Sequence, residues 1–428
     1  MRWLQTTMGE VCLPTVQIDP TRKDTESFRY IDIAGIDREQ KTIFRADPIP
    51  CESAPSRARK LVQAGDVLVS TVRPNLNAVA LVPEELDGEI ASTGFSVLRA
   101  NPKLVNPRYL FYRVQHQEFV ACLVANATGA SYPAVTDGVV RRAPLPLPSL
   151  KEQARIVEIL DEADQLRRLR READAKAARI LPALFLKMFG DPATNPRGWD
   201  MTTVGDIVRA TDYGTSTRAS DDGSGIPLIR MGNVDYNGHL DLRDLKHVQL
   251  SDSEVARFRL QQGDILFNRT NSKELVGKTG LWDADIDAVA ASYFIRVRLD
   301  QKQVTPTFFW AFMNCSYIKK ILLATARGAI GQANINSSEL RAMVIYKPPL
   351  DQQYLFTNRW KQIRATIPQR IGDQTDLDNL FSALLQRAFS GQLTAKWREA
   401  HSKELLAEME QQARLLNLPL TKKLELAP

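Results

Sequence analysis

Residues 148–191 read PSLKEQARIVEILDEADQLRRLRREADAKAARILPALFLKMFGD, and this stretch organises the rest of the chain. Apolar residues recur in it at alternating steps of three and four, with one gap at Arg170; they are Ile156, Ile159, Ala163, Leu166, Ala173, Ala177, Ile180 and Leu184. This spacing predicts one apolar seam on a helix, with the period of a coiled coil. A helix of about 40 residues is roughly 60 Å long and cannot bury such a seam alone. We therefore expect a partner helix.

Residues 348–393 supply a candidate for that partner. At an offset of 200, several residues of the two stretches are the same; the pairs are Leu150 and Leu350, Gln153 and Gln353, Leu184 and Leu384, and Phe189 and Phe389. Two related helices far apart in sequence most simply pair within one molecule. Pro182 and Pro368 interrupt the two patterns, and an interior proline kinks or breaks a helix, so we expect a bend or short break near each.

The composition is that of a soluble globular protein with two or three domains. The chain has 428 residues, 44% of them hydrophobic and 25% charged, and a net charge of +6, which favours a polyanionic partner. The cysteines and histidines are scattered without disulfide or zinc spacing, so we expect reduced thiols and no metal site. No transmembrane run or signal segment is visible, which predicts a cytoplasmic protein without membrane contact.

The chain repeats itself in order. Short apolar runs between turn signals predict strands in residues 1–147, and residues 107–124 have helical spacing. The series Trp3, Thr6, Thr7, Gly9 returns at residues 199–205, and Gly65-Asp66-Val67-Leu68 returns as Gly263-Asp264-Ile265-Leu266. The offset drifts only between 196 and 200 along the whole half. We interpret the chain as a tandem duplication of an α/β domain followed by a long helix.

Enzyme motifs are weak. Val276-Gly277-Lys278-Thr279 is similar to the end of a phosphate-binding loop, but that motif needs a glycine at position 272, which is serine. Dinucleotide, zinc-protease and hydrolase signatures are absent. We therefore predict no catalytic residue and no metal site.

Polar segments follow each Gly-Asp strand. Arginine pairs with guanine and asparagine with adenine, while Ser, Thr and Lys suit phosphates, so these segments are candidates for DNA contact. A polar turn that caps its own backbone is the alternative, and spacing alone leaves both open. The candidates are Ser70, Thr71, Arg73, Asn75 and Asn77 in the first half and Asn268, Arg269, Thr270, Asn271, Ser272 and Lys273 in the second, with Tyr213, Thr215, Ser216, Arg218, Lys278 and Arg327 as further loop or basic residues.

With these residues, nearly the whole chain resembles the specificity subunits of type I restriction–modification systems. The stretches that carry the resemblance are Pro148-x-Leu150-x-Glu152-Gln153-x-x-Ile156, Phe189-Gly190-Asp191-Pro192, Gly65-Asp66-x-Leu68 with Arg73-Pro74-Asn75, Gly263-Asp264-Ile265-Leu266-x-Asn268-Arg269, and Arg387-Ala388-Phe389-x-Gly391. None is a catalytic signature, but their duplicated order is specific. The second helix has Asp351-Gln352-Gln353 where the family commonly has a Glu-Gln pair.

The resemblance implies a non-catalytic subunit that binds double-stranded DNA. In that family each globular domain reads half of a split sequence, and two long antiparallel helices set the unread gap. The helices also dock two copies of an adenine methyltransferase subunit, to which restriction subunits can add. S-adenosylmethionine, ATP and Mg²⁺ then belong to the partners, and this chain needs no cofactor. The helix residues expected to contact partners are Leu150, Gln153, Ile156, Leu184, Phe189, Leu350, Gln353, Leu384 and Phe389.

The predicted fold is α/β, with two similar domains separated by two long helices that form an antiparallel coiled coil. The predicted boundaries are 1–147 and 193–347 for the recognition domains, 148–192 and 348–395 for the helices, and 396–428 for a tail. Two other functions stay open. The chain could serve a related system whose partners are fused nuclease–methyltransferases, or it could be a coiled-coil scaffold that does not bind DNA.

Overall fold

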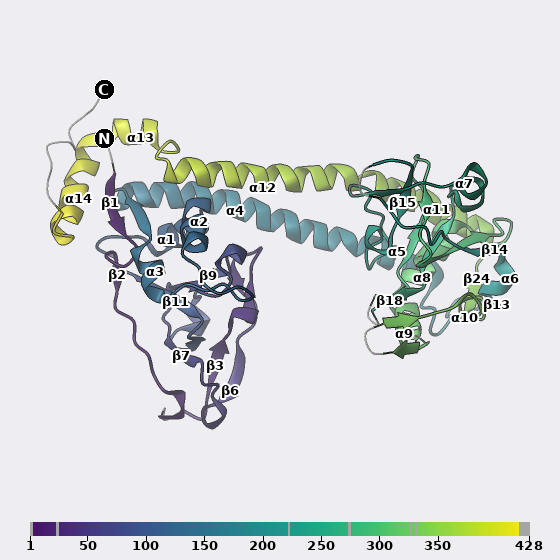
Figure 1. Cartoon of the computed structure of the whole chain (residues 1–428), viewed down its shortest axis with the longest axis horizontal. Helices are drawn as coiled ribbons and strands as arrows, with labels where there is room; N and C mark the ends of the chain where they lie inside the picture. Colours follow the sequence, from purple (N-terminus) through teal and green to yellow (C-terminus); the bar gives the residue numbers. More distant parts are fainter. Residues whose placement is uncertain are drawn as a thin grey trace. The chain divides into compact units, whose positions relative to one another are not determined.

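The computed structural model describes residues 3–22, 25–220, 223–272, 275–325, 327–329 and 332–418. The chain divides into two compact units, which are described separately. Unit 1 comprises Met1–Arg171 together with Gly372–Pro428, and unit 2 comprises Glu172–Ile371. Each unit therefore contains a globular α/β body and parts of both long helical stretches (Figure 1).

Unit 1 is built on two four-stranded sheets. One sheet has the order β2 (Cys12–Leu13), β11 (Phe95–Ala100), β8 (Val67–Ser70) and β9 (Val79–Leu81). The other has the order β6 (Asp47–Pro50), β3 (Ser27–Ile31), β10 (Ile90–Ser92) and β7 (Ala58–Leu61). Two further pairs are β1 (Leu4–Thr7) with β12 (Pro144–Leu147) and β4 (Ile36–Asp37) with β5 (Thr42–Ile43). All four residues of β8 are buried, as expected for a central strand.

Unit 2 repeats the first of these sheets and the parallel pair of the second. The repeated sheet has the order β14 (Val208–Tyr213), β21 (Phe294–Leu299), β17 (Ile265–Asn268) and β19 (Thr279–Leu281). A three-stranded sheet has the order β16 (Lys246–Val248), β15 (Ile226–Ile229) and β20 (Val289–Ala290), and another has the order β18 (Thr270–Asn271), β23 (Gln332–Asn334) and β22 (Arg327–Ala329). Strands β13 (Asp200–Thr203) and β24 (Val344–Lys347) form a pair. Strands β3 and β10 pair in parallel, and so do β15 and β20. Phe95 is opposite Ser70 in unit 1, and Phe294 is opposite Asn268 in unit 2. The predicted duplication is thus present in the strand pairing as well as in the sequence.

Helices follow the same order in both units. In unit 1 they are α1 (Pro107–Arg113), α2 (Gln117–Ala125), α3 (Asp137–Arg142) and the start of α4 (Leu150–Ala178), with α13 (Ala395–Ala400) and α14 (Ser402–Leu415) from the C-terminal part. In unit 2 they are α5 (Ile180–Phe189), α6 (Val204–Ile207), α7 (Asp252–Phe258), α8 (Pro306–Asn314), α9 (Ser316–Thr325), α10 (Ser337–Arg341) and α11 (Leu350–Ala365). Helix α12 (Ile367–Phe389) begins in unit 2 and ends in unit 1.

Both long helical stretches break close to their prolines, as the sequence predicts. Helix α4 ends at Ala178 and α5 begins at Ile180, so Pro182 lies in the first turn of a new helix. A first-turn residue needs no intrahelical N–H partner, which makes this position compatible with proline. Helix α11 ends at Ala365, and Pro368 is the second residue of α12. The linking residues Arg179 and Thr366 have nearly the same backbone angles, φ −83° and ψ −12° against φ −84° and ψ −15°.

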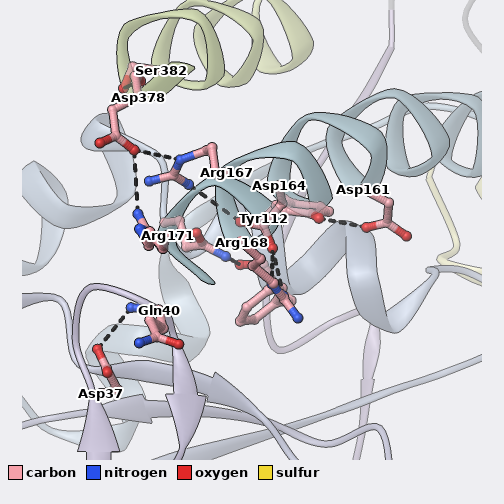
Figure 2. A network of polar contacts seen from close by, with 12 residues as sticks. Asp37, Gln40, Tyr112, Asp161, Asp164, Arg167, Arg168, Arg171, Asp378 and Ser382 are labelled. Carbon is pink, nitrogen blue, oxygen red and sulfur yellow. Dashed lines mark hydrogen bonds and ion pairs between the residues drawn. The ribbon is translucent and has the colours of Figure 1, made fainter. Parts of the chain in front are cut away.

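In unit 1 α4 and α12 pack against each other in antiparallel fashion. Arg167 Nε lies 2.7 Å from an Asp378 oxygen, and Arg170 lies 3.1 Å from Asp373, so the partner number falls as the α4 number rises. Arg167 and Arg171 converge on Asp378 (Figure 2). The Arg167 guanidinium also lies 4.2 Å from the centre of the Phe381 ring.

The predicted apolar seam is wrong for the middle of α4. Of the predicted seam residues, Ile156 and Ala163 are buried and Ile159 is half-buried. Leu166, Ala173 and Ile180 are exposed. The residues that contact α12 further along are the charged Arg167 and Arg170. The physical reason is that α12 presents Asp373 and Asp378 there, and arginine satisfies these carboxylates better than leucine would.

Each long stretch ends in the core of the other unit's fold. Phe389, at the end of α12, packs against Tyr109 of unit 1 with ring centres 5.2 Å apart. Phe189, at the end of α5, packs against Phe308 of unit 2 with ring centres 4.8 Å apart. Tyr109 and Phe308 are counterparts at an offset of 199. The core of unit 1 therefore includes residues of α4 and α12. The core of unit 2 includes residues of α5 and α11.

A buried glutamine ties each long stretch to its globular body. Gln153 Oε1 accepts from the Asn106 N–H at 2.8 Å, and its Nε2 donates to the carbonyl oxygens of Leu104 and Pro148 at 3.0 and 2.8 Å. Gln353 repeats all three hydrogen bonds in unit 2. Its partners are the Thr305 N–H at 2.8 Å, the Gln303 oxygen at 3.2 Å and the Pro348 oxygen at 2.7 Å. Both side chains are fully buried.

Candidate nucleic-acid interface

In unit 1 the candidate loop follows β8 and turns back into β9. Gly65 (φ +82°) begins the repeated Gly-Asp turn, and the Asp66 carboxylate binds Arg99 at 2.7 Å while accepting from the Gln63 N–H. Asp264 and Arg298 form the same ion pair in unit 2 at 3.1 Å. The repeated Gly-Asp motif thus fixes the turn before the strand, and the loop after the strand is what projects.

Three of the five predicted residues in this loop make internal hydrogen bonds. The Ser70 hydroxyl donates to the Val72 carbonyl at 3.0 Å, and the Thr71 hydroxyl donates to the Gly94 carbonyl at 2.9 Å; both residues are buried. Asn77 Nδ2 donates to the Val114 carbonyl, and Lys41 Nζ donates to the Asn77 side chain and carbonyl. Burial, and secondarily the charge of Arg167, lowers the pKa of Lys41 to about 8. These three predicted residues hold the loop in shape.

Arg73 and Asn75 are the exposed members of this loop. Arg73 has a left-handed backbone (φ 49°), and its N–H donates to the Pro133 carbonyl at 2.7 Å. Its guanidinium lies over the Tyr132 ring, 4.6 Å from the centre. Tyr132 itself is 69% exposed. A stacked arginine has fewer conformations to lose on binding.

In unit 2 the corresponding segment gives a similar arrangement from different positions. The Arg269 guanidinium lies over the Tyr213 ring, 4.7 Å from its centre, and Tyr213 is 44% exposed. Arg269 aligns with Thr71 in the repeat, not with Arg73. Among the described residues, Arg269 Nε and Asn268 Nδ2 are buried without a hydrogen-bond partner. Both units thus present a stacked arginine after the same strand.

The remaining predicted residues of unit 2 divide by exposure. Ser216 and Arg218 are exposed beside Tyr213, whereas Thr215 is buried and its hydroxyl donates to Thr217. Lys278 is buried, and its Nζ donates to the Met231 and Val234 carbonyls at 2.7 and 2.6 Å. Its ammonium therefore binds backbone within unit 2. Burial lowers the pKa of this Lys278 ammonium.

Other predicted residues lie in or beside β18. Thr270 and Asn271 form this strand and pair with β23, and the Thr270 hydroxyl donates to Asn334 at 3.5 Å. Asn271 Nδ2 donates to Asn268 and its Oδ1 accepts from the Ser272 N–H. Lys273 lies outside the described residues, as does the side chain of Arg327 in β22.

Sequence reasoning missed the aromatic partner in unit 1 and an aromatic neighbour in unit 2. The Arg73 guanidinium lies over the Tyr132 ring in unit 1. In unit 2 the Tyr293 carbonyl accepts from the Arg269 N–H, and the Tyr293 side chain is partly exposed. Neither tyrosine is close in sequence to its arginine. An exposed tyrosine inside a polar turn, such as Gly129-Ala130-Ser131-Tyr132, was the one available signal.

The residues predicted to bind protein partners lie mostly inside this chain. Gln153, Ile156, Phe189, Gln353 and Phe389 are buried and pack or bond within their own unit. The reason is that each globular body covers the start of one long stretch and the end of the other, so these residues serve that attachment. Leu150, Leu184, Leu350 and Leu384 keep partial exposure.

The described residues contain no cluster of three or more His, Cys, Asp or Glu that could hold a metal ion. No helix within them is long and apolar enough to cross a membrane.

Comparison with known proteins gives a consistent class. Residues 52–176, from the strands before the first candidate loop to the long helix α4, match the family model of the type I restriction modification DNA specificity domain. The specificity subunit of the type I restriction enzyme EcoKI of Escherichia coli K12 is 30% identical over 49% of this chain and 46% of its own length. The StySPI subunit of Salmonella potsdam is 25% identical over 73% of this chain and 71% of its own.

Solved structures agree. A chain in the structure described as the basis of complex assembly and conformational transition of the type I R-M system is 28% identical, with a TM-score of 0.58 over 92% of this chain and 98% of that one. The S subunit from M. genitalium, at 12% identity and a TM-score of 0.51, shares the fold. By these matches the chain is similar to the specificity subunits of type I restriction–modification systems, and residues 52–176 match their DNA specificity domain. The EcoKI alignment spans about half the length of that relative.

Proposed function

We propose that this chain reads a bipartite DNA sequence, with one half-site recognised by each unit. The observation that carries the proposal is the repeated one: after the same strand of both units, an arginine is stacked on an exposed tyrosine. Arginine is the side chain that reads guanine bidentately in the major groove. Arg73 and Asn75 in unit 1, and Arg269, Ser216 and Arg218 in unit 2, are the described residues best placed for such contacts.

The proposal includes partner subunits. Because the similar proteins are specificity subunits of larger restriction enzymes, we propose that two adenine methyltransferase subunits dock on this chain and that restriction subunits can join. S-adenosylmethionine, ATP and Mg²⁺ would bind those partners. Each half-site would contain an adenine that the partner flips out of the duplex and methylates. The DNA is cytoplasmic, and so would be the chain.

Adenine methylation across the host genome tests this proposal. With the gene intact we expect methylation at one split motif, and deletion of the gene should abolish methylation at that motif while leaving other motifs unchanged. A second strain carries the chain with Arg73→Ala and Arg269→Ala, and in this strain methylation at the same motif should be lost or become less specific. An unchanged map, together with no co-purifying methyltransferase, would overturn the proposal.

The assembled complex offers a second test against the scaffold alternative. Binding that neutralises phosphates weakens steeply as salt rises. We therefore expect a salt-sensitive affinity for duplex DNA that contains both half-sites. A scaffold that binds only proteins would show no such binding at any salt concentration.

A further inference from the structure

The C-terminal helix α14 covers one face of unit 1, at the start of α4. Its buried residues are Leu405, Met409, Gln412 and Ala413. Gln412 Nε2 donates to the carbonyl oxygens of Leu104 and Pro148 at 2.8 and 3.2 Å. Gln153 donates to the same two carbonyls from the other side. Each carbonyl therefore accepts two hydrogen bonds, which is its full capacity.

An ion pair fixes the polarity of this contact. Lys151 of α4 forms an ion pair with Glu404 of α14, and its Nζ lies 3.6 Å from Glu408. The Lys151 N–H also donates to Glu408 at 3.1 Å. The docked helix is thus acidic where the face that receives it is basic.

The same face of unit 2 is an open hollow of about 330 Å³. Trp199, Lys302, Gln303, Lys347, Pro348 and Leu350 line it. A hollow of the same volume in unit 1 is formed by the counterparts Lys103 and Leu150, but there α14 supplies the other wall through Glu408, Gln411, Gln412 and Leu415. In unit 2 the counterpart carbonyls of Gln303 and Pro348 accept from Gln353, and among the described residues no second side chain donates to them.

The first turns of α11 extend this hollow with exposed apolar side chains. Tyr354 is 52% exposed and Leu355 is 43% exposed. They lie one helical turn after Leu350 and Asp351, hence on the same face. Their counterparts on α4 are Ala154 and Arg155, which are not apolar anchors of that size. Unit 2 therefore has an apolar surface at the place where unit 1 carries its docked helix.

One charge is reversed between the two faces. Lys151, which pairs with α14, has Asp351 as its counterpart, and Asp351 is exposed. Lys302 has Lys103 as its counterpart, so that charge is common to both faces. Asp200 and Lys347 are opposite each other in β13 and β24, and their charges offset one another. An acidic helix such as α14 would be repelled by Asp351.

We propose that this hollow and the adjoining face of α11 bind an amphipathic helix of a second polypeptide. That helix would carry the apolar spacing of α14 and a side-chain amide for the Gln303 and Pro348 carbonyls. It would carry lysine or arginine where α14 has Glu404 and Glu408. The contact is between proteins and stands whether or not the units read DNA.

A charge-exchange experiment on the full-length chain tests this proposal. The probes are two helix-stabilised peptides of residues 402–416, one with the chain's own sequence and one with Glu404→Lys and Glu408→Lys. We expect the basic peptide to bind at least ten times more tightly by fluorescence anisotropy and to slow hydrogen exchange in residues 347–355. Asp351→Lys should reverse the preference, and the milder Asp351→Asn should remove it. Lys151→Glu is the matched control on unit 1, and it should leave the protection of residues 347–355 by the basic peptide unchanged.

Two results would overturn the proposal. One is a basic peptide that gives no protection of residues 347–355 in the folded chain. The other is binding that ignores Asp351→Lys and Asp351→Asn but responds to Lys151→Glu, which would mean exchange with the tail on unit 1. No DNA is present in the assay, so neither result bears on the proposed function.

Discussion

At the scale of single residues, the two buried glutamines occupy equivalent positions, but the carbonyls that they bind have a second donor only in unit 1 among the described residues. Gln153 and Gln353 make the same three hydrogen bonds, but in unit 1 Gln412 donates to the same carbonyls as Gln153. A buried carbonyl or N–H left without a partner costs about 1–3 kcal/mol. The two positions should therefore respond differently to the same change.

We expect Gln353→Met to destabilise unit 2 by about 2–4 kcal/mol, since the Thr305 N–H and two carbonyls lose their partner. Gln153→Met should cost unit 1 less, because Gln412 still serves the Leu104 and Pro148 carbonyls. Methionine keeps the length of the side chain and so limits cavity effects. Urea titration followed by hydrogen exchange within each unit measures both values. Equal losses would contradict the assigned support from Gln412.

The stacked arginine of unit 2 gives a prediction on specificity. Arg269→Ala should weaken binding of the complex by about 1–3 kcal/mol if Arg269 reads a guanine, and should relax one position in one half-site only. Arg73→Ala is the matched variant for the other half-site. Selection from a DNA library with the variant complexes measures both effects. Equal weakening at both half-sites would exclude base reading by Arg269.

The sequence located the candidate loops but not which of their side chains are available. Asn77 could have faced solvent, yet its amide binds the Val114 carbonyl and Lys41, neither of which is near in sequence. Lys278 likewise looked like a free cation, but carbonyls of the segment 231–234 surround it. Exposure in such loops depends on long-range packing, which a local pattern does not contain.

At the scale of elements, the expected long helices and their breaks near Pro182 and Pro368 are present, because proline acts through its own missing N–H. The expected helix over 107–124 is two helices, since α1 ends at Arg113 and His116 caps the start of α2. An apolar seam was predicted along the middle of α4, but the contacts that this part of α4 makes with α12 are ion pairs. Leucine and arginine alternate there, so the face that is used depends on α12, which lies about 200 residues away.

The contact between α2 and the end of α12 should depend on pH. Burial, and then the neighbouring Arg113, lowers the pKa of His116 below its ordinary value of 6.5. His116 Nδ1 accepts from the Glu118 N–H, so Nε2 carries the proton that it donates to Gln386 at 2.7 Å. As the pH falls, His116 is protonated in the unfolded chain at a higher pH than in the folded chain. The contribution of neutral His116 to the free energy of unfolding is therefore fully present above pH 6.5 and is lost as the pH falls.

Hydrogen exchange of residues 381–389 between pH 7.5 and 5 measures this loss. We expect exchange, corrected for its intrinsic pH dependence, to quicken below pH 6.5, and we expect His116→Gln to flatten the profile. The readout must be specific to unit 1, because burial also lowers the pKa of His239 in unit 2. A wild-type profile as flat as that of His116→Gln would show that His116 is not the titrating group.

At the scale of the whole molecule, the duplication is the feature that the sequence reveals most fully. Ordered matches at a nearly constant offset predicted two related bodies, and the pairing of β8 with β11 returns residue for residue between β17 and β21. The tail was less predictable. Its helix α14 binds Lys151 of unit 1, and the counterpart of Lys151 in the second half is Asp351.

If the long helices set the gap between half-sites, their length should control the recognised sequence. Inserting one heptad into α4 and a matching heptad into α12 should lengthen the unread gap or abolish methylation, while the bases of each half-site stay the same. Heptads preserve the face that a helix presents to its partner. Methylation mapping with the lengthened chain measures the gap. An unchanged gap with full activity would exclude this role of the helices.

The split composition of unit 1 has a consequence for the order in which the protein takes shape on the ribosome. Unit 2 is one continuous segment and can close as soon as Glu172–Ile371 has emerged. Unit 1 begins earlier but needs Phe381, Leu385 and Phe389 for its core, and they are made nearly last. The first body to be synthesised is thus the second to be finished, and until then part of its apolar interior has no cover from α12.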